Sequence, residues 1–92
     1  MTYRLQHKNR IYTLHEQPWH EVVVLRGVYS ISTPELGLYS MEPGLSLVVD
    51  AYCELFDVQY RDLVECDVSE LTEDALAVRA AFQDLVISVE CL

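Results

Sequence analysis

The spacing of apolar residues changes along this chain, and that change limits the folds it can form. In the first third, apolar residues such as Tyr3 and Leu5 alternate with polar ones, which is the period of a half-buried strand. From Leu45 they recur every three or four residues, which is the period of a helix. We predict one α+β domain with an N-terminal antiparallel β-meander, two helices at about 45–56 and 73–84, and a C-terminal run at 85–91 that can close the sheet.

Four short runs make up the predicted meander. The runs 3–7 and 11–14 flank Lys8-Asn9, where asparagine tolerates the positive φ of a tight hairpin turn. The run Val22–Leu25 is continuous and apolar, which is typical of a strand covered on both faces. A turn at Arg26-Gly27 and the alternating run 28–32 complete a second hairpin. Gln17-Pro18 breaks the pairing between the hairpins, because proline has no N–H for a ladder.

Residues 33–44 contain two prolines and two glycines and are predicted to form a connecting loop. Thr33-Pro34-Glu35 favours a single helical turn at its start, because threonine caps helices and proline suits the first helical position. The loop also carries four sizeable apolar side chains. They either pack beneath the sheet or form an exposed contact surface: Leu36, Leu38, Tyr39 and Met41.

The two helices are predicted from different signals. In 45–56, Val48, Tyr52 and Phe56 fall on one face and acids on the other, although an alternating strand also fits this segment. The helix is favoured because it segregates the acids. The second helix begins at Thr72, which can cap it, and acids in the first turn complement the helix dipole. Residues 58–71 stay unassigned.

Charge is distributed unevenly along the chain. Residues 1–26 hold four of the six Lys/Arg and two acids, whereas residues 27–92 hold two Lys/Arg and thirteen acids. The formal charge is therefore about +2 in the first segment and −11 in the second, which gives the overall −9. Such a field repels nucleic acid phosphates and attracts basic protein surfaces.

The lengths of the apolar runs bear on whether the chain enters a membrane. Its apolar runs, such as Val22–Leu25 and Leu47–Val49, are far short of the ~20 residues that span a bilayer. We therefore expect a protein of the bacterial host cytoplasm that does not enter membranes.

The three cysteines, Cys53, Cys66 and Cys91, show no CxxC spacing, so we expect reduced thiols packed as small apolar residues, with a single disulfide as the alternative.

The chain carries no complete catalytic or cofactor motif. His15 and His20 superficially resemble a zinc-protease pair, but they are five residues apart and Pro18 lies between them. His7 can approach His15 across a hairpin, so a three-histidine metal site is the alternative to surface histidines. We expect no enzyme, no cofactor and no metal.

Two segments resemble parts of Cro-type helix-turn-helix repressors. Asn9–Gln17 is similar to the first helix of that family (N-R-I-x-x-L-R-E-x), and Pro43–Val64 is similar to its fourth and fifth helices. The resemblance implies a DNA-binding regulator in which residues 9–17 are helical. The segment 19–34, where the recognition unit belongs, departs from the family through Val22-Val23-Val24, Gly27 and Pro34, so no base-reading residue is carried over.

The leading hypothesis is a small acidic protein that inhibits a macromolecular partner by covering a basic, nucleic-acid-binding surface. An anti-CRISPR-like phage protein, an antitoxin or an immunity protein would act in this way, and a subunit of a larger acidic assembly is a further possibility. We expect no direct nucleic acid binding, despite Arg4 and Lys8 near aromatic residues. The predicted steering acids are Asp50, Glu54, Asp57, Asp62, Glu65 and Asp67, and the predicted apolar anchors are Trp19, Tyr39, Met41 and Phe56.

Overall fold

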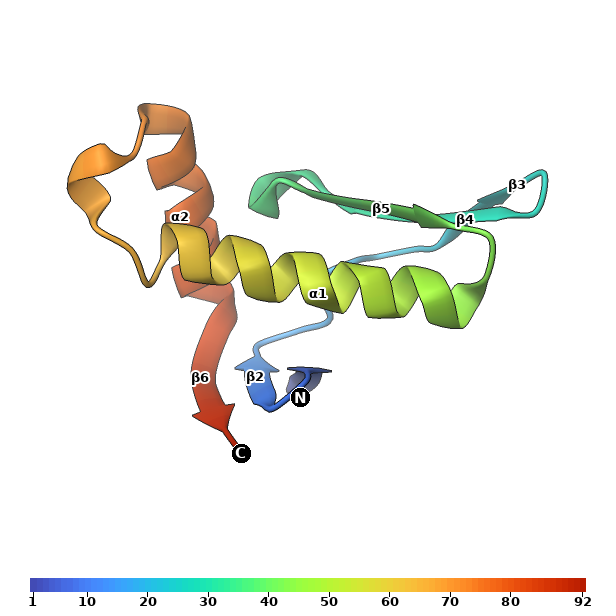
Figure 1. Cartoon of the computed structure of the whole chain (residues 1–92), viewed down its shortest axis with the longest axis horizontal. Coiled ribbons are helices and arrows are strands. Elements are labelled where there is room, and N and C mark those ends of the chain that lie inside the picture. Colours follow the sequence, from blue (N-terminus) through green and yellow to red (C-terminus); the bar gives the residue numbers. More distant parts are fainter.

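The computed structural model describes all 92 residues and confirms the α+β class (Figure 1). It contains two antiparallel sheets of three strands each, which we name sheet A (order β1-β2-β6) and sheet B (order β3-β4-β5). The elements are β1 (Tyr3–His7), β2 (Arg10–Leu14), β3 (Val23–Leu25), β4 (Val28–Thr33), the 3-10 turn η1 (Pro34–Leu36), β5 (Leu38–Glu42), α1 (Leu45–Leu63), the 3-10 turn η2 (Val68–Glu70), α2 (Glu73–Leu85) and β6 (Val86–Cys91).

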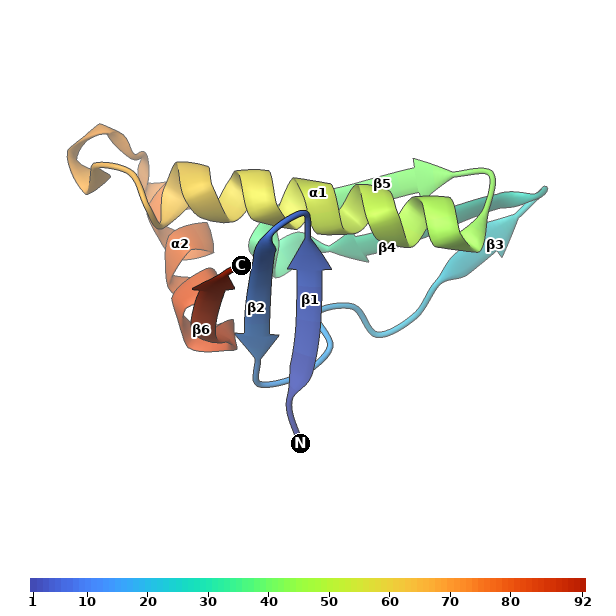
Figure 2. The same cartoon turned by 60° about the horizontal axis from the view of Figure 1, so that its bottom comes forward.

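The single four-stranded meander is wrong, although both of its hairpins form. β1 pairs with β2 and β3 pairs with β4, but β2 and β3 lie in different sheets. The free edge of β2 is taken by the C-terminal strand β6, with Tyr12 opposite Val89. The segment between the hairpins carries Pro18 and crosses from one sheet to the other (Figure 2).

Both hairpin turns form at the expected residues, Lys8-Asn9 and Arg26-Gly27, but the first turn differs in one detail. Lys8 (φ 53°), and not Asn9, takes the positive φ of the first turn. In the second turn both Arg26 (φ 53°) and Gly27 (φ 75°) are left-handed, which defines a two-residue type I′ turn. β3 pairs only with β4 and is therefore an edge strand, and all three of its residues are exposed. The prediction of a strand covered on both faces is therefore wrong.

The predicted loop at 33–44 contains a strand. The helical turn is confirmed as η1, which ends at Gly37 in a left-handed conformation (φ 65°). The chain then returns as β5 beside β4, with Leu38 opposite Thr33. Leu36 and Leu38 are buried whereas Tyr39 and Met41 are exposed, so each interpretation of this apolar segment holds for half of it.

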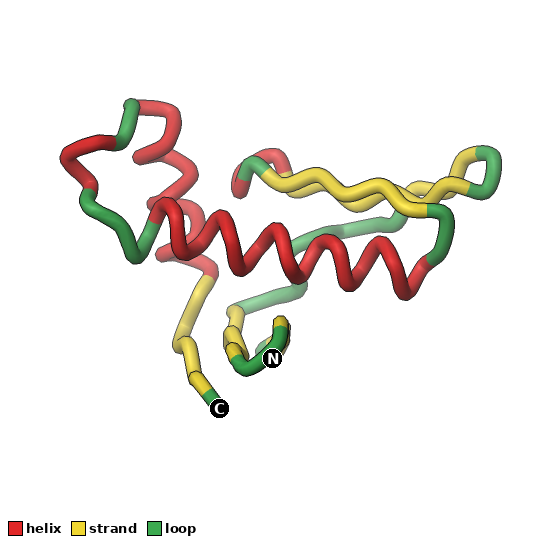
Figure 3. The backbone as a smooth tube through the Cα atoms, viewed as in Figure 1, coloured by secondary structure: helices red, strands yellow, loops and turns green.

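Helix α1 is longer than predicted and organises the molecule. It lies along sheet B on one side, and the strands of sheet A run across it on another (Figures 2 and 3). Its second half includes residues that the sequence left unassigned, and α2 follows after η2. The cap of α2 is confirmed, because Thr72 Oγ1 accepts a hydrogen bond from the Ala75 N–H at 3.2 Å.

The core is aromatic and lies between α1, α2 and the inner faces of the two sheets. Phe56 of α1 packs edge-on against Tyr12 of β2 and Phe82 of α2, with ring centroids 5.1 Å apart in both pairs. Trp19 packs in the same way on Tyr52, at 5.0 Å. The residues that form the core are Leu5, Tyr12, Leu14, Trp19, Ile31, Leu36, Leu38, Val48, Tyr52, Phe56 and Phe82.

The cysteines are free thiols, but only one is packed. Cys53 is half-buried in α1, whereas Cys66 and Cys91 are exposed. The expectation of three buried apolar cysteines is thus wrong for two of them, because Cys66 follows the end of α1 and Cys91 ends the edge strand β6.

Candidate functional site

One predicted steering acid belongs to the interior of the protein. Asp57 is only 6% exposed, and its Oδ1 accepts hydrogen bonds from the Tyr12 hydroxyl and, at 3.2 Å, from Arg61 Nε. Arg10, also buried, lies with its Nε 3.4 Å from the same oxygen. The prediction that Asp57 faces a partner is therefore wrong, because sheet A crosses α1 at this residue and covers its carboxylate.

The charges around Asp57 keep it ionised. Burial alone favours the neutral acid, but the hydrogen bonds from Tyr12 and Arg61 and the positive charge of both arginines outweigh it, so the pKa of Asp57 lies below its ordinary value. Burial and the hydrogen bond to Asp57 in turn raise the pKa of Tyr12. Arg10 extends the group to Glu65 through a hydrogen bond of 3.0 Å from Nη2 to Oε2. This ionic cluster ties β2 to the second half of α1 and to Glu65, just beyond the C-terminal end of the helix.

The other predicted acids are exposed. Asp50 and Glu54 project from α1, and neither forms an ion pair or a side-chain hydrogen bond. Asp67 accepts a hydrogen bond from the Ser69 N–H at 3.0 Å, and this bond lowers the pKa of Asp67. Three further acids extend the same surface into α2. We name the group from the end of α1 to the start of α2 the acidic cap: Asp62, Glu65, Asp67, Glu70, Glu73 and Asp74.

The acidic cap contains no compensating base. No Lys or Arg occurs between Asp62 and Val78, and all six acids are exposed. Only Glu65 forms an ion pair. The connection that carries the cap lies at one end of the longest axis of the molecule, opposite the tip of the β3–β4 hairpin (Figure 1). The cap is therefore a localised field of one sign.

Two of the four predicted apolar anchors are buried and two are exposed. Trp19 and Phe56 are core residues, so the prediction that they contact a partner is wrong. Tyr39 and Met41 are more than half exposed, but they lie on β5 in sheet B and not on the cap. Exposed apolar residues that flank the cap were not predicted: Val58, Val68 and Leu76.

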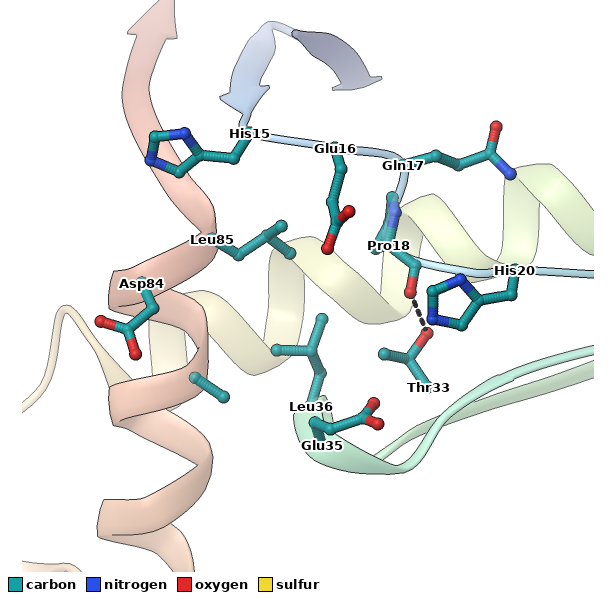
Figure 4. A pocket seen from close by; sticks show the side chains of 11 residues that line it. His15, Glu16, Gln17, Pro18, His20, Thr33, Glu35, Leu36, Asp84 and Leu85 are labelled. Atoms are coloured by element: carbon teal, nitrogen blue, oxygen red, sulfur yellow. Dashed lines mark hydrogen bonds between the residues drawn. The ribbon is translucent and has the colours of Figure 1, made fainter. Parts of the chain in front are cut away.

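A separate cavity of about 420 Å³ lies between the segment 15–20, η1 and the end of α2 (Figure 4). It brings together His15, His20 and three acids, Glu16, Glu35 and Asp84, with no Lys or Arg among its lining residues. His7 is not part of it, and no group of three or more His, Cys, Asp or Glu is arranged to hold a metal ion. The three-histidine arrangement does not form.

The hydroxyl in this cavity is already engaged. Thr33 Oγ1 donates to the Pro18 carbonyl at 3.0 Å and lies 2.6 Å from the Tyr52 hydroxyl oxygen. The cavity thus has three carboxylates among its lining residues, and its hydroxyl is held by the fold.

Comparison with protein-family models, curated proteins and solved structures finds no match to this chain. The helix implied for residues 9–17 by the repressor resemblance is wrong, because Arg10–Leu14 forms the central strand of sheet A. Residues 45–63 form one continuous helix where that family has two. Neither α1 nor α2 has the length and apolar character needed to cross a bilayer.

Proposed function

We propose that this chain is a small acidic inhibitor that works by binding, and that its acidic cap covers a basic, nucleic-acid-binding surface of another macromolecule. The observation that carries the proposal is the concentration of six exposed acids without a base between Asp62 and Val78. Charges arranged in this way accelerate and orient association with Lys/Arg-rich surfaces. A partner that normally binds phosphates offers such a surface.

Apolar contacts must accompany the charges, because electrostatic steering contributes more to association rate than to affinity. Val58, Val68 and Leu76 are each more than 40% exposed and belong to the elements that carry the cap. We propose them as the anchors, in place of Trp19 and Phe56. Asp50 and Glu54 extend the negative surface along α1 toward its first half.

The acids of the cap also differ in how dispensable they are for folding. Asp67 caps η2, and Glu65 holds Arg10. Asp62 and Glu70 form no ion pair and no side-chain hydrogen bond, and Glu73 contributes only to the helix dipole. The last three are therefore the positions at which charge can be reversed with the least damage to the fold.

The test is affinity capture from host lysate, with and without nuclease, using the chain and two triple variants. One variant reverses Asp62, Glu70 and Glu73 to Lys, and the matched control reverses the exposed acids Glu16, Glu35 and Glu90 to Lys. Both change the net charge equally, so only the location differs. We expect the cap variant to lose at least about tenfold in capture and the control to lose much less.

Capture becomes inhibition only if nucleic acid is displaced. The captured protein must bind nucleic acid in isolation, and the chain must compete for that site with an affinity that falls between ~0.1 and ~0.5 M salt. Equal losses in the two variants would show that net charge and not the cap matters. Recovery of nucleic acid that disappears on nuclease treatment would contradict the proposal.

A further inference from the structure

Sheet B has a free edge without any charged side chain. β3 consists of Val23, Val24 and Leu25, which are 50%, 54% and 70% exposed, and no strand covers its outer side. The other edge strands each contain charged residues: Arg4 in β1, Glu42 in β5 and Glu90 in β6. Charges on an edge strand discourage pairing with another chain, and β3 has none.

The backbone of β3 offers hydrogen-bonding groups at its centre. Because the type I′ turn joins Leu25 to Val28, these two residues form a hydrogen-bonded pair, and so do Val23 and Ser30 two residues further along. Successive strand residues direct their N–H and C=O groups to opposite sides. The N–H and C=O of Val24 therefore point away from β4, toward the open edge.

The charges that flank β3 indicate what kind of strand it can pair with. Glu21 precedes the apolar run and Arg26 follows it. An antiparallel copy of the same segment, centred on Val24, sets Glu21 of one chain opposite Gly27 of the other and Val22 opposite Arg26, so Glu21 and Arg26 of the partner subunit occupy neighbouring positions on opposite faces of the paired strands. By symmetry one Glu21 and one Arg26 lie at each end of the paired strands, while apolar residues meet between them. The segment is complementary to itself in the antiparallel direction only.

We propose that two copies of the chain pair through β3 and form one continuous six-stranded sheet with two-fold symmetry. Edge-to-edge addition of strands is an established mode of association, and a two-fold axis uses the same patch on both copies. Val23 and Leu25 share the outer face of sheet B with Tyr39 and Met41, so pairing joins two uncharged faces. The acidic caps lie at the far ends of the pair, because β3 and the cap are at opposite ends of the molecule (Figure 1).

Sedimentation of the full chain over a range of concentrations tests this pairing. Reductant is required, because the exposed thiols of Cys66 and Cys91 could otherwise link two copies. We expect a reversible dimer, and Val24→Lys to weaken it at least about tenfold through repulsion of two facing ammonium groups. Ile87→Lys on the edge strand β6 is the matched control, since Ile87 is 48% exposed, and it leaves the dimer unchanged. A chain that stays monomeric up to about 0.5 mM would overturn the proposal.

Charge exchange tests the register of the pair. Glu21→Arg alone and Arg26→Glu alone each place like charges together and weaken self-association. A mixture of these two variants restores complementarity and forms the heterodimer in preference to either homodimer. Circular dichroism and thermal unfolding of each variant verify that the hairpin folds. A dimer that is indifferent to Val24→Lys, or a mixture that forms no heterodimer, would exclude pairing through β3. The variants leave the acidic cap untouched, so these results are independent of the proposed function.

Discussion

The two ends of this molecule have opposite chemistry. At one end, the cap between Asp62 and Asp74 carries six exposed acids and no base. At the other end, the three residues of β3 are exposed and uncharged, and Tyr39 and Met41 extend the same uncharged face. α1 runs between the two ends (Figure 1). The six acids of the cap account for −6 of the net charge of −9, so the negative charge is not spread evenly over the surface but concentrated at one end.

Because one end is acidic and the other uncharged, we expect the two ends to contact different kinds of partner. A surface of one charge sign repels its own copy and selects a partner of opposite sign, whereas an uncharged sheet edge can accept a copy of itself. The acidic end also needs internal support, because mutual repulsion opposes its folding. The ionic cluster of Arg10, Asp57 and Glu65 supplies that support, since it ties the second half of α1 to sheet A.

The largest effect is expected from Asp57→Ala, which removes the acceptor of the hydrogen bonds from Tyr12 and Arg61 and an ion-pair partner of Arg10. Arg10 is 8% exposed and would be left as a buried charge with only Glu65 as a counter-ion. We expect a loss of about 3–5 kcal/mol in the free energy of unfolding, measured by urea denaturation. Asp50→Ala on the same helix is the control and changes this free energy by no more than about 0.5 kcal/mol. Equal effects would mean that the two acids do not differ as the structure indicates.

Acid is expected to destabilise the chain through the same residue. The pKa of Asp57 is lower in the folded chain than its ordinary value of 3.8, so the unfolded state binds more protons between these two values. The stabilisation is therefore complete above about pH 5 and is lost as the pH falls through the folded pKa. Unfolding free energies measured from neutral pH down to about pH 3 should converge for the wild type and Asp57→Asn. A constant difference between the two curves would contradict this assignment.

Thr72→Ala is expected to have a smaller effect at the acidic end. Its hydroxyl accepts a hydrogen bond from the Ala75 N–H and caps α2. Removing an N-cap of this kind costs about 1 kcal/mol. Thr72→Ser retains the hydroxyl and should restore most of the loss, as measured by urea denaturation. If serine fails to restore stability, the effect of Thr72→Ala does not arise from the cap.

The different exposure of two acids on one helix, Asp50 and Asp57, shows how far the sequence predicts the site. Asp50 and Asp57 are seven residues apart in α1 and therefore share a helical face, so helical spacing alone predicts the same exposure for both. Asp57 is nevertheless buried, because β2 crosses the helix there and brings Tyr12 within hydrogen-bonding distance from 45 residues away. Such a contact depends on tertiary arrangement, which local periodicity does not contain.

The fold was predicted best where its signals are local. The two hairpins, the start of α1 and the cap of α2 depend on neighbouring residues, and all of them form. β5 was missed because its apolar residues, Leu38, Tyr39 and Met41, occupy both faces of the strand and obscure the two-residue period. The division into two sheets was missed because it depends on β6, which pairs with β2 from the opposite end of the chain.

The smallest effect, and the most direct test of the contrast between the ends, is a single added lysine. Asp62→Lys relieves repulsion in the cap, so at low salt it should raise the free energy of unfolding by a few tenths of a kcal/mol, roughly the size of surface charge effects. Leu25→Lys, at a position 70% exposed in β3, adds one positive charge far from the cap. Asp62→Lys changes the net charge by two units and Leu25→Lys by one, so in dilute monomer Leu25→Lys should change stability by less than half as much, and about 0.5 M salt should abolish the difference by screening the charges. If Leu25→Lys stabilises the chain by half as much as Asp62→Lys or more, the acids act through net charge, and the two ends are not electrostatically distinct.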